Sequence, residues 1–158
     1  MEQYIQPFID VCQHCFKEFV GLDLKVGRPY IADRISLNEW DISAVIGLTG
    51  EARGAVVISM KNDLAITLTE ILTGSSHKKI DDDVVDAIGE IVNIISGNAK
   101  KGLEDSFRLI ISLPTVIHGK NHAVKWPASN ARIICIPFYL LENSSFNLSV
   151  ALESVRGA

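Results

Sequence analysis

The chain has 158 residues, of which 47% are hydrophobic, and a formal net charge of -4. This composition argues against disorder, and the length suits one domain over residues 1–158 with a substantial buried core. No basic run is present to neutralise a phosphate backbone, so nucleic acid is not an expected partner. No stretch approaches the roughly 20 apolar residues of a membrane span, and the first residues lack signal-peptide features. The sequence therefore predicts a cytoplasmic protein that does not enter a membrane.

Periodicity along the chain predicts helices followed by a series of strands. The expected helices, with apolar residues every three or four positions, cover residues 2–20, 62–74 (from an Asn62 or Asp63 cap) and 81–102. The expected strands cover residues 22–26, 40–49, 54–60, 107–113, 115–118, 122–126, 131–138 and 146–152. Because strands follow one another without helices after residue 102, an α+β fold with a mostly antiparallel sheet and packed helices is predicted. The similar order of elements in the two halves suggests an internal duplication.

The third expected helix carries the most informative stretch of the chain. Plotted at about 100° per residue, its apolar side chains gather on one side, and the opposite side carries Asp86, Glu90, Asn93 and Gly97. An acidic run suits the start of this helix, and two lysines and a glycine suit its end. A merely solvated face usually mixes lysine and glutamate pairs, so a face with two acids, an amide and a glycine is unusual.

Two glycines, Gly89 and Gly97, lie inside this expected helix. Each costs roughly 1 kcal/mol relative to alanine, so each needs a packing or a docking reason. Gly97 follows Asn93 by one turn on the polar side. The backbone of another protein could approach closely there.

The familiar catalytic motifs are absent from the sequence, including the nucleophile elbow, the P-loop, the dinucleotide fingerprint and H-E-x-x-H. Cys12 and Cys15 form a C-x-x-C, but their helical spacing places both sulfurs on the buried side, and no second ligand pair completes a zinc site. Cys135 is also expected in the core. His118 and His122 are separated by a turn, so no metal site is expected from them or elsewhere.

What remains is Glu90-x-x-Asn93, the only E-x-x-N in the chain. A carboxamide is a poor base and nucleophile, so catalysis by Asn93 would mean orienting a water molecule or stabilising charge. Phosphoryl hydrolysis uses such help, because its transition state leaves the protein little covalent work. A convex helix offers no phosphate-binding loop and no set of metal ligands. The substrate would have to bring both, which points to another protein.

These residues resemble the CheX branch of the CheC/CheX/FliY family of chemotaxis phosphatases. The resemblance rests on Asp86-x-x-x-Glu90-x-x-Asn93 with Pro114 beyond, and on the surrounding DAIGEIVNIISGNAK and SLPTVIHG. Similarity at Pro7-Phe8 and at GAVVISM extends it to most of the chain. The chain has one copy of the signature rather than the two typical of CheC, which places it on the CheX side.

The resemblance implies a phosphatase that hydrolyses the aspartyl phosphate of a CheY-like response regulator. Asn93 would orient the attacking water, and Glu90 would pair with a lysine of the receiver domain. The expected docking residues lie around this pair or beyond the helix: Asp86, Gly89, Gly97 and Pro114. Mg²⁺ would be held by the response regulator, so no cofactor of the chain's own is implied. The resemblance also implies a CheC-like fold and a homodimer with a continuous sheet. The alternative to the phosphatase function is a non-catalytic adaptor that docks a receiver domain or a flagellar switch component.

Overall fold

A computed structural model describes residues 2–32, 39–120, 122, 124, 126 and 132–155. The helices are α1 (Glu2–Cys15), α2 (Asn62–Thr73) and α3 (Asp82–Leu103), and a π-helical turn, η1 (Phe16–Val20), continues α1. The strands are β1 (Lys25–Val26), β2 (Tyr30–Ala32), β3 (Ile42–Gly50), β4 (Ala52–Met60), β5 (Leu109–Ile111), β6 (Thr115–His118), β7 (Ile133–Leu140) and β8 (Ser144–Ser154). Of the strand expected over 122–126, residues 123 and 125 lie outside the described residues, and residues 122, 124 and 126 belong to no strand.

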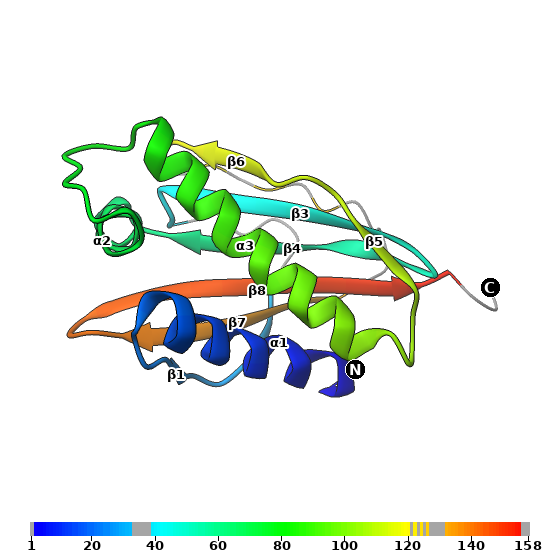
Figure 1. The fold of residues 1–158 in the computed structure, drawn as a ribbon. Helices are drawn as coiled ribbons and strands as arrows, with labels where there is room; N and C mark the ends of the chain where they lie inside the picture. Colours follow the sequence, from blue (N-terminus) through cyan, green and yellow to red (C-terminus); the bar gives the residue numbers. More distant parts are fainter. Residues whose placement is uncertain are drawn as a thin grey trace.

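The strands form one sheet in the order β1-β7-β8-β4-β3-β5, with β2 also paired to β7 and β6 also paired to β3. Every pairing between these strands is antiparallel. Figure 1 shows the three helices together on one face of this sheet, with α3 crossing it diagonally between α1 and α2. The predicted α+β class with a mostly antiparallel sheet is therefore confirmed. The internal duplication stays a prediction.

The core lies between the helices and the sheet. Alternate residues of β3, from Ile42 to Leu48, are buried in the same cluster as the apolar side of α3. Stacked aromatic rings extend this core, with ring centroids 5.0 Å apart for Phe16 and Phe146 and 5.3 Å apart for Phe138 and Phe146. Burying a side chain of this kind stabilises a fold by roughly 1.5–3 kcal/mol, so the helix layer is held mainly by apolar contact.

The start of α2 differs from the prediction. Neither Asn62 nor Asp63 caps this helix; instead, the backbone N–H of Asn62 donates to Oδ2 of Asp41 at 3.0 Å. Asp41 lies just before β3, so the capping carboxylate comes from a residue distant in sequence. The expected end of the helix is confirmed, because Gly74 adopts the left-handed backbone conformation with φ of 72°.

Helix α3 begins as its sequence predicts, but Gly102 does not end it, because the helix continues to Leu103 and Glu104 follows in a right-handed conformation. Oδ1 of Asp81 accepts from the backbone N–H of Val84 at 3.0 Å, and acidic residues fill the first turn and lysines the last turn. The helix packs against α1, α2 and β3. One side of α3 is therefore fixed in the core along its length, and the opposite side faces outward. Within the described residues, no helix is long and apolar enough to cross a membrane.

The three cysteines are free and buried, as the sequence predicts. Cys12 and Cys15 belong to the main core, and burial raises the pKa of both thiols above the usual value. A thiol kept protonated is a poor metal ligand and a poor nucleophile. The C-x-x-C of α1 therefore acts as apolar packing.

Candidate active site

Glu90 and Asn93 lie one turn apart on the outward side of α3. Glu90 is exposed and Asn93 is half-buried, whereas Ile91 and Val92 between them are buried. Side chains three positions apart on a helix have Cβ atoms roughly 5–6 Å apart. One partner surface could therefore meet the carboxylate and the carboxamide together.

Both side chains are free to bind a partner. Within the described part of the chain, neither Glu90 nor Asn93 makes a side-chain hydrogen bond or an ion pair. Asn98 on the same helix behaves differently, because its amide donates to the carbonyl oxygen of Ile94 at 2.8 Å. The Asn93 amide keeps two N–H donors and a carbonyl acceptor available to a partner or a water molecule.

Asp86 and Gly97 extend the outward side of α3 in both directions. Asp86 is exposed one turn before Glu90, and Gly97 is half-buried one turn after Asn93. Two further exposed acids, Asp82 and Asp83, lie in the first turn. The part of α3 that precedes Asn93 is therefore strongly negative, which favours a partner that presents lysine or arginine there.

Gly89 requires a correction, because it does not lie on the open side of α3. Gly89 is buried, and a Cβ added there would lie 3.4 Å from Cγ2 of Val116 and 3.5 Å from Cγ of Pro114. The helix therefore packs on β6 and on the residue before it at this point. Gly89 is therefore not accessible to a docking partner, and an added Cβ would meet Val116 and Pro114 at ordinary van der Waals distances.

Gly97 has no comparable neighbour. The nearest atom to an added Cβ would be Cδ1 of Ile111 at 3.9 Å, which is an ordinary van der Waals distance. The free protein thus has room for alanine at this position, although glycine in a helix interior costs roughly 1 kcal/mol. Packing within the described chain gives no reason for this glycine.

The connection between β5 and β6 lies beside this helix and is firmly held. The backbone N–H of Ser112 donates to the Gly47 carbonyl oxygen at 2.9 Å, and the Gly47 N–H donates to the Ser112 hydroxyl at 2.8 Å. Pro114 is half-buried against α3, and the preceding Leu113 is 87% exposed. Leu113 is a candidate contact that the sequence reasoning missed, although an apolar residue before a proline in a turn could have indicated it.

The histidines near β6 form no metal site of the type weighed from the sequence. His122 uses both ring nitrogens, since Nε2 lies 2.6 Å from the Ser43 hydroxyl and Nδ1 lies 2.7 Å from the Gly119 carbonyl oxygen. Ser43 is fully buried and also hydrogen-bonds Ser59 at 2.7 Å. His118 is exposed. The Ser43–His122 contact is therefore structural, since no substrate could reach the buried hydroxyl.

At the start of α3, His77 and Asp81 form a separate polar contact. Nδ1 of His77 lies 2.9 Å from Oδ2 of Asp81. This hydrogen bond is the main cause that raises the pKa of His77 and lowers the pKa of Asp81 from their usual values. Because Asp81 also caps α3, the contact fixes the first turn of the helix that carries Glu90 and Asn93.

An antiparallel sheet covered on one face by helices, in this strand order, is the fold of CheC-like proteins. A CheC-like superfamily protein from Shewanella sp. PV-4 has this fold, with a TM-score of 0.86 and 27% identity over 96% of this chain and 98% of that one. A family model described as chemotaxis phosphatase CheX matches residues 42–139. The chain therefore belongs to the CheX family of chemotaxis phosphatases, and the predicted enzyme class is confirmed.

Two further relatives bear on function. The chain is 25% identical over 152 residues to the CheY-P phosphatase CheX of Thermotoga maritima, covering 95% of this chain and 96% of that protein. It also shares its fold with CheX of Borrelia burgdorferi, with a TM-score of 0.82 and 23% identity over 96% of this chain and 98% of that one. The Borrelia structure is a complex of CheX with CheY, BeF₃ and Mg²⁺.

Proposed function

We propose that this protein hydrolyses the aspartyl phosphate of a CheY-like response regulator, with Asn93 orienting the attacking water and Glu90 pairing with a lysine of the receiver domain. The observation that carries this proposal is the unpartnered carboxylate and carboxamide on one outward turn of α3. The CheY-P phosphatase of Thermotoga and the CheX–CheY complex of Borrelia support the choice of partner.

The chemistry that we assign to Asn93 is positional. In hydrolysis, the oxygen of water bonds to phosphorus while the bond from phosphorus to the aspartyl oxygen breaks, which leaves a free aspartate and inorganic phosphate. The Asn93 carbonyl oxygen accepts a hydrogen bond from the water and holds it in line with the breaking bond. A water molecule already held in line gives up less freedom on the way to the transition state, and the barrier falls.

We assign the Mg²⁺ of the reaction to the receiver domain. The Glu90–Asn93 turn offers one carboxylate and one carboxamide on a convex surface, and Mg²⁺ prefers several oxygen ligands at octahedral positions. The group of His, Cys and acidic residues that could hold an ion in the described chain does not include Glu90. Mg²⁺ bound by the receiver would neutralise phosphate charge there, and this chain would add only the positioning groups.

The docking surface in this proposal is the outward side of α3. Asp86 and Glu90 supply negative charge to a basic patch of the receiver, and Gly97 lets the receiver backbone approach the helix closely. Pro114 supports α3 at Gly89, and the exposed Leu113 beside it supplies an apolar contact.

We also propose that the protein acts in the cytoplasm as a homodimer whose sheet continues across the interface. The outer side of β2, where Tyr30 is 48% and Ile31 is 58% exposed, supports this arrangement. Strand edges with apolar side chains are ready templates for pairing with another chain. Sedimentation velocity of the purified protein tests the dimer, and a charged residue in place of Ile31 should shift it toward the monomer.

The proposal is tested by following phosphate release from a receiver domain phosphorylated by a small-molecule donor. The protein should accelerate release, and Asn93→Ala should abolish most of the acceleration. Asn98→Ala is the matched control, because it removes an exposed carboxamide from another side of the same helix. A receiver that binds the protein yet loses phosphate at its intrinsic rate would support the adaptor alternative instead.

A further inference from the structure

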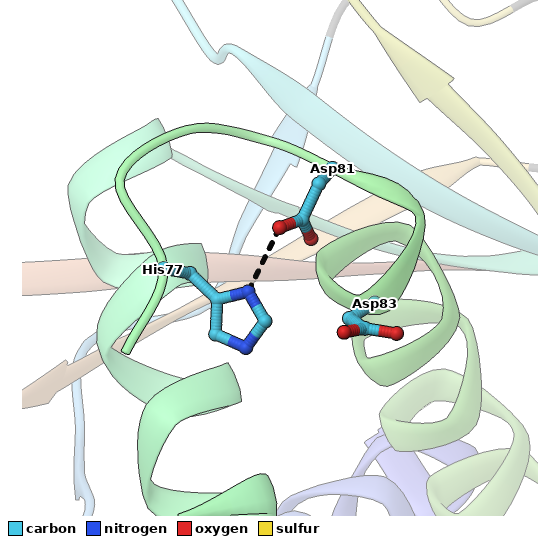
Figure 2. Close-up of side chains that lie close together, drawn as sticks. All are labelled: His77, Asp81 and Asp83. Atoms are coloured by element: carbon cyan, nitrogen blue, oxygen red, sulfur yellow. Dashed lines mark hydrogen bonds and ion pairs between the residues drawn. The ribbon is translucent and has the colours of Figure 1, made fainter. Parts of the chain in front are cut away.

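A second group of ionisable side chains gathers where the connection from α2 meets α3. Figure 2 shows His77 beside Asp81 and Asp83, with Asp83 projecting from the first turn of the helix. One ligand atom from each residue lies within 4.8 Å of the others, and no further group of this kind occurs in the described part of the chain. Asp83, the member nearest to Glu90, lies about two turns before it, so the group takes no part in positioning the attacking water.

The imidazole of His77 has an unsatisfied nitrogen. Its side chain is only 5% exposed, and Nδ1 lies 2.9 Å from Oδ2 of Asp81. Nε2 is buried and has no hydrogen-bond partner among the residues that the structure describes. Buried polar atoms nearly always find partners, so Nε2 needs one besides the described residues: a water molecule, an ion or another ligand. In Figure 2, the ring edge that carries both nitrogens is turned toward α3 and Asp83.

We propose that His77, Asp81 and Asp83 form a binding site for a divalent transition-metal ion such as Zn²⁺. His77 Nε2 and the Asp83 carboxylate bind the ion, and Asp81 holds the imidazole through Nδ1. A metal-binding histidine commonly donates its second N–H to a carboxylate, which fixes the tautomer and leaves the other nitrogen free to bind. Water molecules complete the coordination on the exposed side of Asp83.

The size and charge of the group suit this class of ion. Zinc bonds to nitrogen and oxygen are about 2.0–2.2 Å long, so two ligand atoms of one ion lie at most about 4.3 Å apart. The 4.8 Å spread of the group exceeds this limit, so the exposed Asp83 carboxylate would have to turn toward Nε2 of His77 to share an ion with it. Imidazole with carboxylate favours zinc, nickel or cobalt over Mg²⁺ or Ca²⁺, which prefer oxygen ligands alone. The negative charges of Asp81, Asp83 and Glu70 all act on His77, and they offset the positive end of the α3 dipole.

The ion would link the α2–α3 connection to the first turn of α3. Because this site is not present in an unfolded chain, ion binding favours the folded state by mass action. The inference does not depend on the proposed phosphatase function, and the two can fail separately.

The test uses the full chain after treatment with a chelator and its removal. Zn²⁺ is titrated near neutral pH against a chromophoric competitor, and thermal unfolding is followed with and without the ion. We expect one ion per chain and a higher melting temperature with zinc. Zinc binding should weaken by at least about tenfold in each of three variants, Asp83→Asn, His77→Gln and Asp81→Asn. Asp83 is exposed, so its substitution does not disturb the core.

His118→Ala is the control, because it removes an exposed histidine outside the group and should leave binding unchanged. Circular dichroism of each variant before titration shows whether it is folded. Absence of saturable zinc binding to the unchanged chain would overturn the inference. The inference would also be overturned if the folded Asp83→Asn and His77→Gln variants bound Zn²⁺ as tightly as the unchanged chain, because the ion would then bind elsewhere.

Discussion

Replacing Asn93 with alanine should separate catalysis from folding. The Asn93 side chain makes no hydrogen bond within the described chain and lies half-buried on the outer side of α3. Its removal therefore breaks no hydrogen bond that holds the fold. In the proposed reaction it removes the one group that orients the water.

Asn93→Ala should lower kcat but slightly raise the free energy of unfolding. Loss of one positioned hydrogen-bonding group costs about 10²- to 10³-fold in kcat, or about 2.7–4 kcal/mol of transition-state stabilisation. Alanine is a better helix former than asparagine by up to about 0.7 kcal/mol, so the free energy of unfolding should rise slightly. For a chain of this size, that gain corresponds to a rise in Tm of about 1–3 °C.

The assay measures phosphate release at saturating phosphorylated receiver, which reports kcat. Binding to a receiver activated by beryllium fluoride reports affinity, and thermal unfolding reports Tm. Asn93→Ala should lose rate, retain most of its affinity and keep or raise its Tm. Asn98→Ala, which breaks the bond to the Ile94 carbonyl oxygen, should keep its rate.

Two results would refute this reasoning. If Asn93→Ala released phosphate about as fast as the unchanged protein, the carboxamide would not orient the water. If the variant instead unfolded or lost its affinity for the receiver, Asn93 would serve folding or docking rather than the chemical step.

Four other substitutions test the docking surface of α3 and the cap of α2. Glu90→Ala should weaken receiver binding and lower the rate, whereas Glu104→Gln at the far end of the helix should do neither; unchanged affinity for Glu90→Ala would exclude the lysine contact. Gly97→Ala and Gly89→Ala should each stabilise the free protein by up to about 1 kcal/mol in urea unfolding, because an added Cβ finds ordinary contacts at both positions. Only Gly97→Ala should weaken receiver binding, and equal affinities for the two glycine variants would contradict the proposed close approach. Asp41→Ala should lower the free energy of unfolding by about 1 kcal/mol by removing the α2 cap, and an unchanged urea midpoint would show that the cap contributes nothing.

Some features of the fold could not be predicted because their causes lie far apart in the sequence. Strand β2 was missed, since its three residues have no clear alternation and are defined by pairing with β7. The cap of α2 was assigned to a local residue, whereas Asp41 performs it across the start of β3. Local patterns carry no information about such partners until the sheet brings them together.

The two sites also depend partly on local sequence patterns and partly on contacts between residues distant in sequence. In the sequence, Asp81 and Asp83 belong to the acidic start of the predicted helix, and His77 lies before it with no predicted role. Only the structure shows that the imidazole is buried there with an unpartnered nitrogen. Conversely, Gly89 was expected to be available for docking, and its burial against Val116 and Pro114 depends on how α3 lies across the sheet.

By itself, the sequence determined that α3 is a helix with a capped start and with Glu90 and Asn93 one turn apart, because helical spacing and capping act between near neighbours. The spacing also predicted that this turn faces outward, whereas tertiary structure alone decided that the two side chains stay unpartnered. It also decided that Gly89 is buried against β6 and that Gly97 stays accessible. The physical reason is that burial depends on which distant surfaces meet, and those contacts form only when the helix packs on the sheet.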